Sequence, residues 1–199
     1  MEPIRELIAV DLEMTGLQVK TDRILEIGAV RLVDGQLRDT FQTFVNPHRR
    51  IDARITELTG IRPEMVEDAP EAEEALRKFL EFAGEAPLLG HNVIFDYSFL
   101  KQCAVNHKIS LERSALDTLK IARKVLKEPE KKSLEALCGY FQIGREHAHR
   151  AVDDAGCTAE IFVKFIEMLK DRGVEDLEQL NRMSTPSPDM IKKLPTNHI

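Results

Sequence analysis

The sequence predicts an α/β protein in which α-helices flank a mixed β-sheet. Three strand-like segments, 7–12, 24–33 and 36–45, come first along the chain. After Asp52, short apolar strands alternate with segments whose apolar residues recur at helical spacing. A series of strands followed by strand–helix alternation is typical of a mixed sheet covered by helices. With 43% hydrophobic residues among 199, the chain can bury one sizeable core, which excludes wholesale disorder.

The strands are predicted from short apolar runs rich in β-branched residues. The Thr15-Gly16 pair ends the first run. The Asp34-Gly35 pair joins the next two, because this dipeptide accepts the positive φ angles of a tight hairpin turn. Two shorter strands are expected later in the chain, at 87–91 and 115–116.

Six helices are predicted from apolar residues that recur every three or four positions. Gly60 closes the first, Asp117 caps the fourth, and Ser133 opens the fifth, which Gly144 ends. Arg172-Gly173 ends the last and longest helix. The segments are 53–60, 71–85, 94–107, 117–126, 133–144 and 151–169. We expect one domain over 1–174 and a C-terminal extension or tail over 175–199.

Charge and composition exclude several classes of protein. The 34 Asp and Glu residues exceed the 28 Lys and Arg residues, and the net charge of −6 excludes a strongly basic nucleic-acid coat protein. No run approaches the roughly 18 to 20 apolar residues of a membrane helix, and the N-terminus lacks a signal peptide's apolar core, so we expect a cytoplasmic protein without membrane contact. Cys103, Cys138 and Cys157 lie far apart, which predicts buried apolar groups and no disulfide framework.

Three carboxylates are predicted to converge. Asp11 and Glu13 are two residues apart at the end of a strand, so they point to the same face. Two ionised carboxylates this close repel each other unless one takes up a proton or both bind a cation, and such ligands suit Mg²⁺ or Mn²⁺. Asp96 lies in the first turn of a helix that leaves an apolar strand, at the sheet edge where ligands of open α/β sheets bind.

A histidine and an acidic pair lie at the start of the longest predicted helix. His149 precedes this helix and Asp154 follows five residues later, a spacing that lets both side chains face one pocket. Asp153 is offset from Asp154 by about 100° around the helix. We therefore expect only one of the two acidic residues to face that pocket.

Three motifs resemble those of a known family. They are Asp11-Leu-Glu13-Met-Thr-Gly16, His91-Asn-x-x-Phe-Asp96 and His149-Arg-Ala-Val-Asp-Asp154. In this order and spacing, the chain resembles the histidine-containing (DEDDh) subgroup of the DEDD superfamily of 3′→5′ exonucleases. The resemblance implies a ribonuclease-H-like fold and two Mg²⁺ or Mn²⁺ ions, with His149 as general base. The implied metal ligands are Asp11, Glu13, Asp96 and Asp154.

The resemblance also implies where a 3′-terminal nucleotide binds. One side of it would meet the turn formed by Met14, Thr15, Gly16 and Leu17, and the other side would meet His91, Asn92 and Phe95. Candidates for contacts to the phosphate backbone are Lys101, Lys120, Arg123, Lys124 and Arg150. Aromatic residues make up only 6% of the chain, so a short grip on about one to three nucleotides is expected.

Within this family, two segments favour a DNA exonuclease of proofreading or repair that releases nucleoside 5′-monophosphates from single-stranded 3′ ends. HNVIFDYSFL and LDTLKIARKVLK resemble the proofreading exonucleases of bacterial replicative polymerases, which makes a polymerase subunit a candidate partner. Met14 is instead typical of oligoribonuclease. An RNA 3′ exonuclease of the oligoribonuclease or ribonuclease T kind therefore stays open, because the choice rests on contacts to the 2′-hydroxyl.

Two further alternatives come from other classes. A non-catalytic module that binds nucleic acid or a polymerase would have no need to maintain four clustered carboxylates and the histidine. A zinc hydrolase would use His91, His147 and His149, but neither H-E-x-x-H nor another three-ligand zinc pattern is complete. The proline-rich stretch 183–199 is a candidate docking segment for a polymerase subunit.

Overall fold

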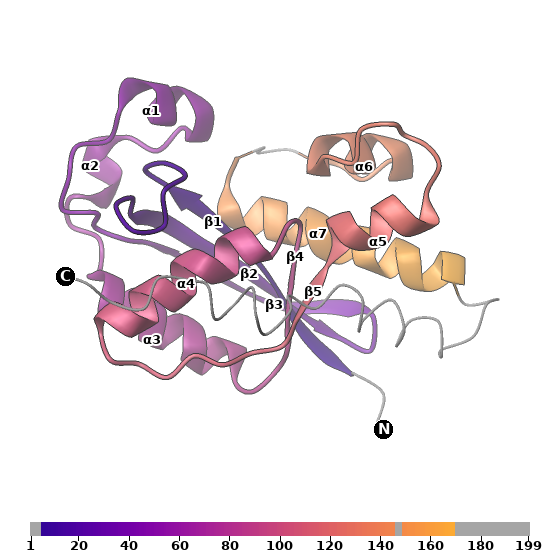
Figure 1. Cartoon of the computed structure of the whole chain (residues 1–199), viewed down its shortest axis with the longest axis horizontal. Helices are drawn as coiled ribbons and strands as arrows, with labels where there is room; N and C mark the ends of the chain where they lie inside the picture. Colours follow the sequence, from indigo (N-terminus) through magenta and orange to yellow (C-terminus); the bar gives the residue numbers. More distant parts are fainter. Residues whose placement is uncertain (1–4, 146–148, 170–199) are drawn as a thin grey trace.

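A five-stranded mixed sheet forms the centre of the protein (Figure 1). The computed structural model describes residues 5–145 and 149–169. The strands are β1 (Glu6–Met14), β2 (Ile24–Val33), β3 (Gln36–Phe44), β4 (Leu88–Gly90) and β5 (Ala115–Asp117), in the spatial order β3-β2-β1-β4-β5. β1, β2 and β3 pair antiparallel, whereas β4 and β5 continue the sheet in parallel. The predicted mixed sheet is confirmed, and this arrangement with its flanking helices is the ribonuclease-H-like fold that the resemblance implies.

Seven helices surround the sheet in the part of the chain that the structure describes. All six predicted helices are present. The additional helix, α2, has a single turn that begins at Pro63, which is too short to show a helical apolar period. The helices are α1 (Ala53–Thr59), α2 (Pro63–Val66), α3 (Ala72–Ala83), α4 (Ile94–Asn106), α5 (Thr118–Val125), α6 (Leu134–Phe141) and α7 (Ala151–Leu169).

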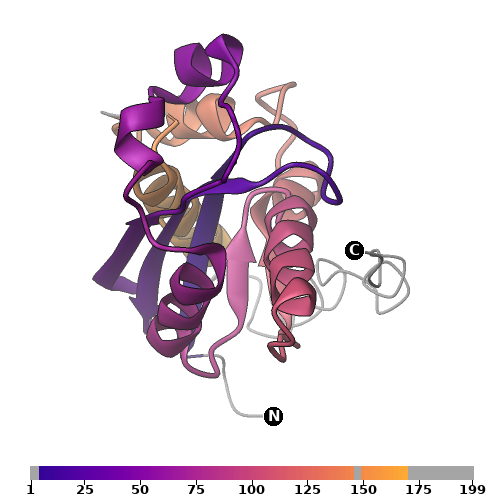
Figure 2. The same cartoon turned by 90° about the vertical axis from the view of Figure 1, so that its left-hand side faces the viewer.

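α3 and α4 form a layer on one face of the sheet, and α5, α6 and α7 form a layer on the other (Figures 1 and 2). Ile8 of β1 packs with Phe79 of α3 and Leu100 of α4 in one buried cluster. Leu7 and Ala9, which point to the opposite face, pack in a second cluster with residues of α5, α6 and α7. β1 is therefore covered on both faces, which explains its almost continuous apolar run.

The predicted caps mostly hold. The Asp117 carboxylate accepts hydrogen bonds from two backbone N–H groups of α5, and the Ser133 hydroxyl accepts one from α6. Gly60 ends α1 in the left-handed region, with φ 72°. The predicted end of α6 at Gly144 is wrong, because Gln142 adopts a φ of 58° and its N–H returns to carbonyl oxygens of the last turn.

Several predictions fall outside the described residues. They are the helix end at Arg172-Gly173, the division between 1–174 and 175–199, the proline-rich stretch 183–199 and the role of His147. No described helix is both long and apolar enough to cross a membrane. The three cysteines are buried and free, as predicted.

Candidate active site

Asp11 and Glu13 lie at the carboxyl end of β1, on the face of the sheet that α7 covers. Side chains alternate along a strand, so both continue the row of Leu7 and Ala9, which belongs to the cluster packed against α7. Glu13 is only 9% exposed. The pairing with β2 shifts register between Glu13 and Met14, where β1 ends. Both carboxylates therefore stand where the chain leaves the sheet.

Asp96 reaches the same edge from α4. It lies in the first turn of that helix and is buried. Its Oδ1 accepts a hydrogen bond from the backbone N–H of Leu12 at 3.1 Å. Because Leu12 lies between Asp11 and Glu13 in the sequence, this bond holds Asp96 beside both carboxylates of β1.

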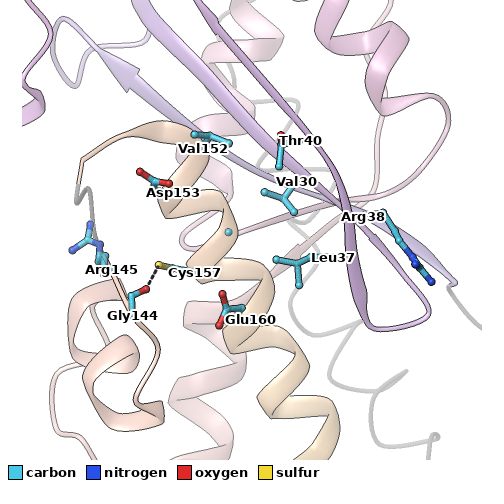
Figure 3. A pocket seen from close by; sticks show the side chains of 11 residues that line it. Val30, Leu37, Arg38, Thr40, Gly144, Arg145, Val152, Asp153, Cys157 and Glu160 are labelled. Atoms are coloured by element: carbon cyan, nitrogen blue, oxygen red, sulfur yellow. Dashed lines mark hydrogen bonds between the residues drawn. The ribbon is translucent and has the colours of Figure 1, made fainter.

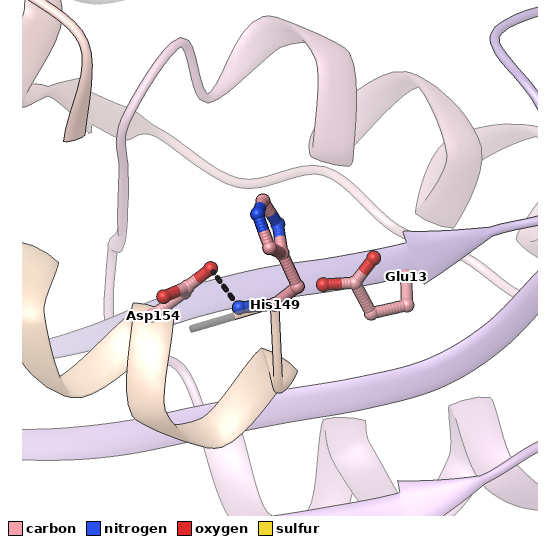
Figure 4. Close-up of side chains that lie close together, drawn as sticks. All are labelled: Glu13, His149 and Asp154. Atoms are coloured by element: carbon pink, nitrogen blue, oxygen red, sulfur yellow. Dashed lines mark hydrogen bonds between the residues drawn. The ribbon is translucent and has the colours of Figure 1, made fainter. Parts of the chain in front are cut away.

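His149 and Asp154 come from the beginning of α7 (Figure 4). One potential metal-binding atom from each of Glu13, His149 and Asp154 lies within 4.8 Å of the other two. Asp154 is buried, and its Oδ2 accepts a hydrogen bond from the backbone N–H of His149 at 3.3 Å. His149 itself adopts a φ of 64°, which turns the chain into the helix. The structure thus brings the late motif to the carboxylates of β1.

Asp153 points away from the carboxylate cluster. It lines a cavity of about 390 Å³ formed by residues of β2, β3 and α7, among them Cys157 and Glu160, and by Arg145 (Figure 3). Of the two neighbouring acidic residues, only Asp154 joins the carboxylate cluster. This separation agrees with the offset of about 100° between consecutive helical residues.

The clustered carboxyl groups resist ionisation. Burial, followed by the charge of Asp154, raises the pKa of Glu13 to about 8. Burial also raises the pKa of Asp96 to about 7, although the hydrogen bond from Leu12 opposes that shift. The pKa of Asp11 is raised well above its ordinary value, by burial first and then by the neighbouring carboxylates. A divalent cation would relieve this repulsion, because an opposite charge favours the ionised form.

Arg145 lies within the acidic cluster. Its Nε and Nη2 donate to Oδ1 and Oδ2 of Asp154, each at 2.8 Å, and both side chains are largely buried. The guanidinium charge lowers the pKa of Asp11 and of Glu13, against the effect of burial. The sequence analysis missed Arg145, since no helix or strand period relates it to Asp154 nine residues later.

Glu26 of β2 holds the start of α7 in place. Its side chain is fully buried and accepts hydrogen bonds from Nε and Nη2 of Arg150, at 3.2 and 2.8 Å. The backbone N–H of Ala151 donates to it at 3.3 Å, and Gln42 donates at 2.5 Å. Because Arg150 directly follows His149, these bonds fix the backbone beside the histidine. Glu26 is the charged residue inside the apolar segment Leu-Glu-Ile-Gly-Ala-Val. This unusual placement could have indicated a buried ion pair, but the sequence analysis missed the role of Glu26.

Two of the predicted phosphate contacts have partners inside the fold. Arg150 binds Glu26, and its guanidinium also lies 5.3 Å from the centre of the Phe44 ring. Lys101 forms an ion pair with Glu112 and donates to a backbone carbonyl at 2.8 Å. These two cations have partners within the protein. The other predicted phosphate contacts are Lys120, Arg123 and Lys124, all in α5.

The loop after β1 is built around Asp22. The Thr15 hydroxyl donates to its carboxylate at 3.4 Å, and a backbone N–H donates at 2.8 Å. A Cβ at Gly16 would lie 2.4 Å from an Asp22 oxygen, so any other residue there would have to displace the Asp22 carboxylate. Met14 packs against the core, whereas Leu17 is 76% exposed and is available for contact with a ligand.

His91 and Asn92 form the corner between β4 and α4. The Nδ1 of His91 lies 2.9 Å from the Thr118 hydroxyl, and the N–H of Asn92 donates to the Asp117 carboxylate at 3.0 Å. Asn92 has a φ of 66°, which asparagine tolerates well. Phe95, the second residue of α4, is partly buried against the core. All three residues lie next to the strand end that carries the carboxylates.

Comparison with known proteins identifies the family. Residues 8–162 match the RNase T-type exonuclease family. The chain is 43% identical over 194 residues to the PolC-type DNA polymerase III of Caldanaerobacter subterraneus subsp. tengcongensis, which covers 98% of this chain and 14% of the relative. The PolC-type polymerase of Bacillus subtilis is 35% identical over 177 residues, 87% of this chain and 12% of the relative. The chain thus spans about one seventh of the curated relatives' length or less.

Solved structures share the fold. Exonuclease X in complex with 5′-overhanging duplex DNA superposes with a TM-score of 0.67 and 25% identity, over 81% of this chain and 92% of that one. Escherichia coli exonuclease I in complex with a dT13 oligonucleotide superposes with a TM-score of 0.75 and 16% identity, over 84% of this chain and 42% of that one.

The chain belongs to the exonuclease family, in its DEDDh group of metal-dependent 3′→5′ exonucleases. Enzymes of this group use divalent metal ions to hydrolyse phosphodiester bonds. Within the group, the chain is homologous to the exonuclease region of PolC-type DNA polymerase III.

Proposed function

We propose that this chain hydrolyses DNA from its 3′ end and releases nucleoside 5′-monophosphates, in proofreading or repair. The observation that carries the proposal is the convergence of Asp11, Glu13, Asp96, Asp154 and His149 at one edge of the sheet. Homology to a replicative polymerase's exonuclease region supports DNA as substrate, and so does the duplex DNA bound to exonuclease X.

The four carboxylates are the proposed ligands of two Mg²⁺ or Mn²⁺ ions. Oxygen donors of this kind suit hard divalent cations, and four carboxylates against the single guanidinium of Arg145 leave negative charge that such cations would balance. When bound, such ions activate a water molecule and neutralise charge on the leaving 3′ oxygen. Arg145 holds both oxygens of Asp154, so we expect this pair to loosen when the carboxylate binds an ion.

His149 is the proposed general base. An imidazole can accept a proton near neutral pH, and this ring lies beside the carboxylates that would hold the ions. The backbone that follows His149 is held in place, because Arg150 and Ala151 donate hydrogen bonds to Glu26. We expect the ring to take the proton of the attacking water.

The 3′-terminal nucleotide is proposed to lie between the loop after β1 and the β4–α4 corner. The exposed Leu17 side chain and the loop backbone from Met14 to Gly16 would contact the sugar and base from one side. His91, Asn92 and Phe95 would line the other side. The small number of aromatic residues is consistent with a grip on only the terminal nucleotides.

The test is digestion of 5′-labelled single-stranded DNA and RNA of the same sequence, with Mn²⁺ or with EDTA. The proposal expects DNA to shorten stepwise from its 3′ end only when metal is present. Preferential shortening of RNA would favour the oligoribonuclease-like alternative that Met14 suggests. If neither strand is cut with any divalent metal, the proposal is wrong.

A DNA polymerase is the proposed partner of this chain. The proposed location of both proteins is the cytoplasm. The support is the homology to PolC-type polymerases, in which the matching region is a small part of a longer chain. Co-purification with a polymerase subunit, with and without residues 183–199, tests whether the proline-rich stretch takes part. Equal recovery of both forms would remove that stretch from the interface.

A further inference from the structure

Positive charge is concentrated in one segment beside the candidate active site. Residues 118–133 contain six of the chain's 28 Lys and Arg residues but only two of its 34 Asp and Glu residues. The chain as a whole carries a net charge of −6. This segment forms α5 and the connection that leads to α6.

The basic segment lines a pocket of about 640 Å³. Arg123, from the last turn of α5, and Lys127 and Lys131, from the connection to α6, surround it with exposed side chains. His91 forms the wall toward the candidate active site, and Glu130 is the acidic residue in the lining. We call this the basic pocket.

The cations of the basic pocket are not neutralised by the fold. Arg145 and Arg150, which lie at the candidate active site, are each bound to a buried carboxylate. In contrast, Arg123, Lys127 and Lys131 form no ion pair with any residue that the structure describes. Their charge is therefore available to an anionic ligand.

The shape of the basic pocket is maintained by contacts of its own. The Nζ of Lys132 donates to the backbone carbonyls of Lys127, at 3.2 Å, and of Pro129. The His91 ring binds the Thr118 hydroxyl at 2.9 Å, and both His91 and Lys132 line the pocket. The imidazole thus ties the start of the basic segment to the end of β4.

His91 also places the basic pocket next to the carboxylates. β1 and β4 run parallel, with Ala9 opposite Leu89. Asp11 lies two residues beyond this pair on β1, and His91 directly follows the end of β4 at Gly90 on the neighbouring strand. A strand whose 3′ end lies at Asp11 can therefore extend past His91 into the basic pocket.

We propose that the basic pocket binds the phosphodiester backbone of the substrate strand, upstream of the nucleotide that is removed. This inference rests on the proposed function. Arg123, Lys127 and Lys131 would contact phosphates, which position a strand without reading its sequence. Such contacts would offset the repulsion between a strand and a protein of negative net charge.

The test uses two substrates that differ in whether upstream phosphates are present. One is a 5′-labelled DNA dodecamer, and the other is the p-nitrophenyl ester of thymidine 5′-monophosphate, which has none. In the variant R123Q/K127Q/K131Q, we expect KM for the dodecamer to rise roughly tenfold at 0.1 M salt. We also expect the slope of log KM against log salt concentration to fall by about 2. We expect kcat/KM for the ester to stay at the wild-type value.

The matched control is R77Q/K78Q/K108Q. It removes three exposed positive charges from α3 and from the residues after α4, at the end of α4 away from Asp96. We expect this control to leave KM for the dodecamer within about twofold, since distant charges are screened beyond roughly 10 Å at 0.1 M salt.

The outcomes separate the basic pocket from the proposed function. If the wild-type protein cleaves neither substrate, the proposed function itself is wrong. If it cleaves both and the pocket variant matches the control variant on the dodecamer, the basic pocket does not bind the strand. If the pocket variant loses the ester reaction as well, the segment supports the active site itself and the inference is overturned.

Discussion

His149 is expected to move a proton, whereas the neighbouring carboxylates are expected to hold metal ions. The variant H149N should therefore lower kcat by about 10²- to 10⁴-fold while the affinity for Mn²⁺ changes only a few-fold. Asparagine is the suitable replacement because it tolerates the φ of 64° at this position. Calorimetric titration with Mn²⁺ and the rate of nucleotide release measure the two effects. Parallel loss of metal affinity and rate would make His149 a metal ligand instead.

Glu26 acts on the same histidine through the backbone. E26A would leave the Arg150 guanidinium and the Ala151 N–H without their buried acceptor. Breaking such a pair costs about 3 kcal/mol of the free energy of unfolding. Urea denaturation measures this loss, and nucleotide release should slow as well.

A surface ion pair provides the comparison for Glu26. Glu85, which pairs with Arg113, is 97% exposed, and solvent screens such a pair strongly. E85A should therefore leave both the urea midpoint and the rate close to the wild type. Similar losses in E26A and E85A would show that Glu26 has no special role in placing α7.

At the scale of elements, the start of α7 lies directly on β2. A Cβ at Gly28 would lie 2.1 Å from backbone atoms of Ala151 and Val152, so G28A must push the helix from the sheet. We expect a loss of about 3 kcal/mol or more in the free energy of unfolding. Nucleotide release should fall too, because the displaced turn carries Asp154.

Gly156, which lies in α7 itself, provides the control substitution for G28A. A Cβ at Gly156 meets no atom within 4 Å, and the residue is inside the helix. G156A should therefore raise the free energy of unfolding by about 0.5 to 1 kcal/mol. Thermal or urea denaturation of both variants measures the contrast, and effects of the same sign would contradict the close packing at Gly28.

The sequence predicts elements better than it predicts contacts between them. The strands and the longer helices follow from apolar periodicity, and the caps at Asp117 and Ser133 follow from residue type. The end of α6 was misplaced because Gln142, rather than a glycine, takes the left-handed conformation. α2 was not predicted, because a helix of one turn is too short to show a periodic pattern of apolar residues.

The candidate site shows the same division. Its motif residues were identified from spacing and resemblance, and the structure brings Glu13, His149 and Asp154 together. Arg145 and Glu26 were missed because their roles depend on partners that only the folded chain brings near. Glu26 and Arg150, for example, are 124 residues apart.

At the scale of the whole molecule, the carboxylate cluster couples stability to pH and metal. In the folded protein the pKa of Glu13 is about 8 and that of Asp96 about 7, against 4.5 and 3.8 as ordinary values. The folded state therefore keeps protons that the unfolded chain has released, so stability in EDTA should fall as pH rises from about 4 to about 8.

Metal should reverse this trend, because divalent ions bind the ionised carboxylates. We expect the rise in Tm on adding Mn²⁺ to be larger at pH 8 than at pH 6. In EDTA, E13Q should lose less stability than the wild type between these pH values. A wild-type Tm that falls no more steeply than that of E13Q would contradict the raised pKa of Glu13.

Residues from β1, α4 and α7 are proposed to form one metal-binding catalytic centre. Substitutions of Asp153 and Asp154, the acidic pair at the start of α7, test this proposal best. The measurement is Mn²⁺-dependent hydrolysis of the thymidine 5′-monophosphate p-nitrophenyl ester by D154N and D153N. Asp154 lies in the carboxylate cluster, whereas Asp153 lines the cavity of Figure 3. We expect D154N to lose roughly three orders of magnitude in kcat/KM, as several kcal/mol of metal-ion stabilisation disappear, and D153N to stay within a few-fold of the wild type. Equal rates in the two variants, whether both high or both low, would contradict a metal centre built on Asp154.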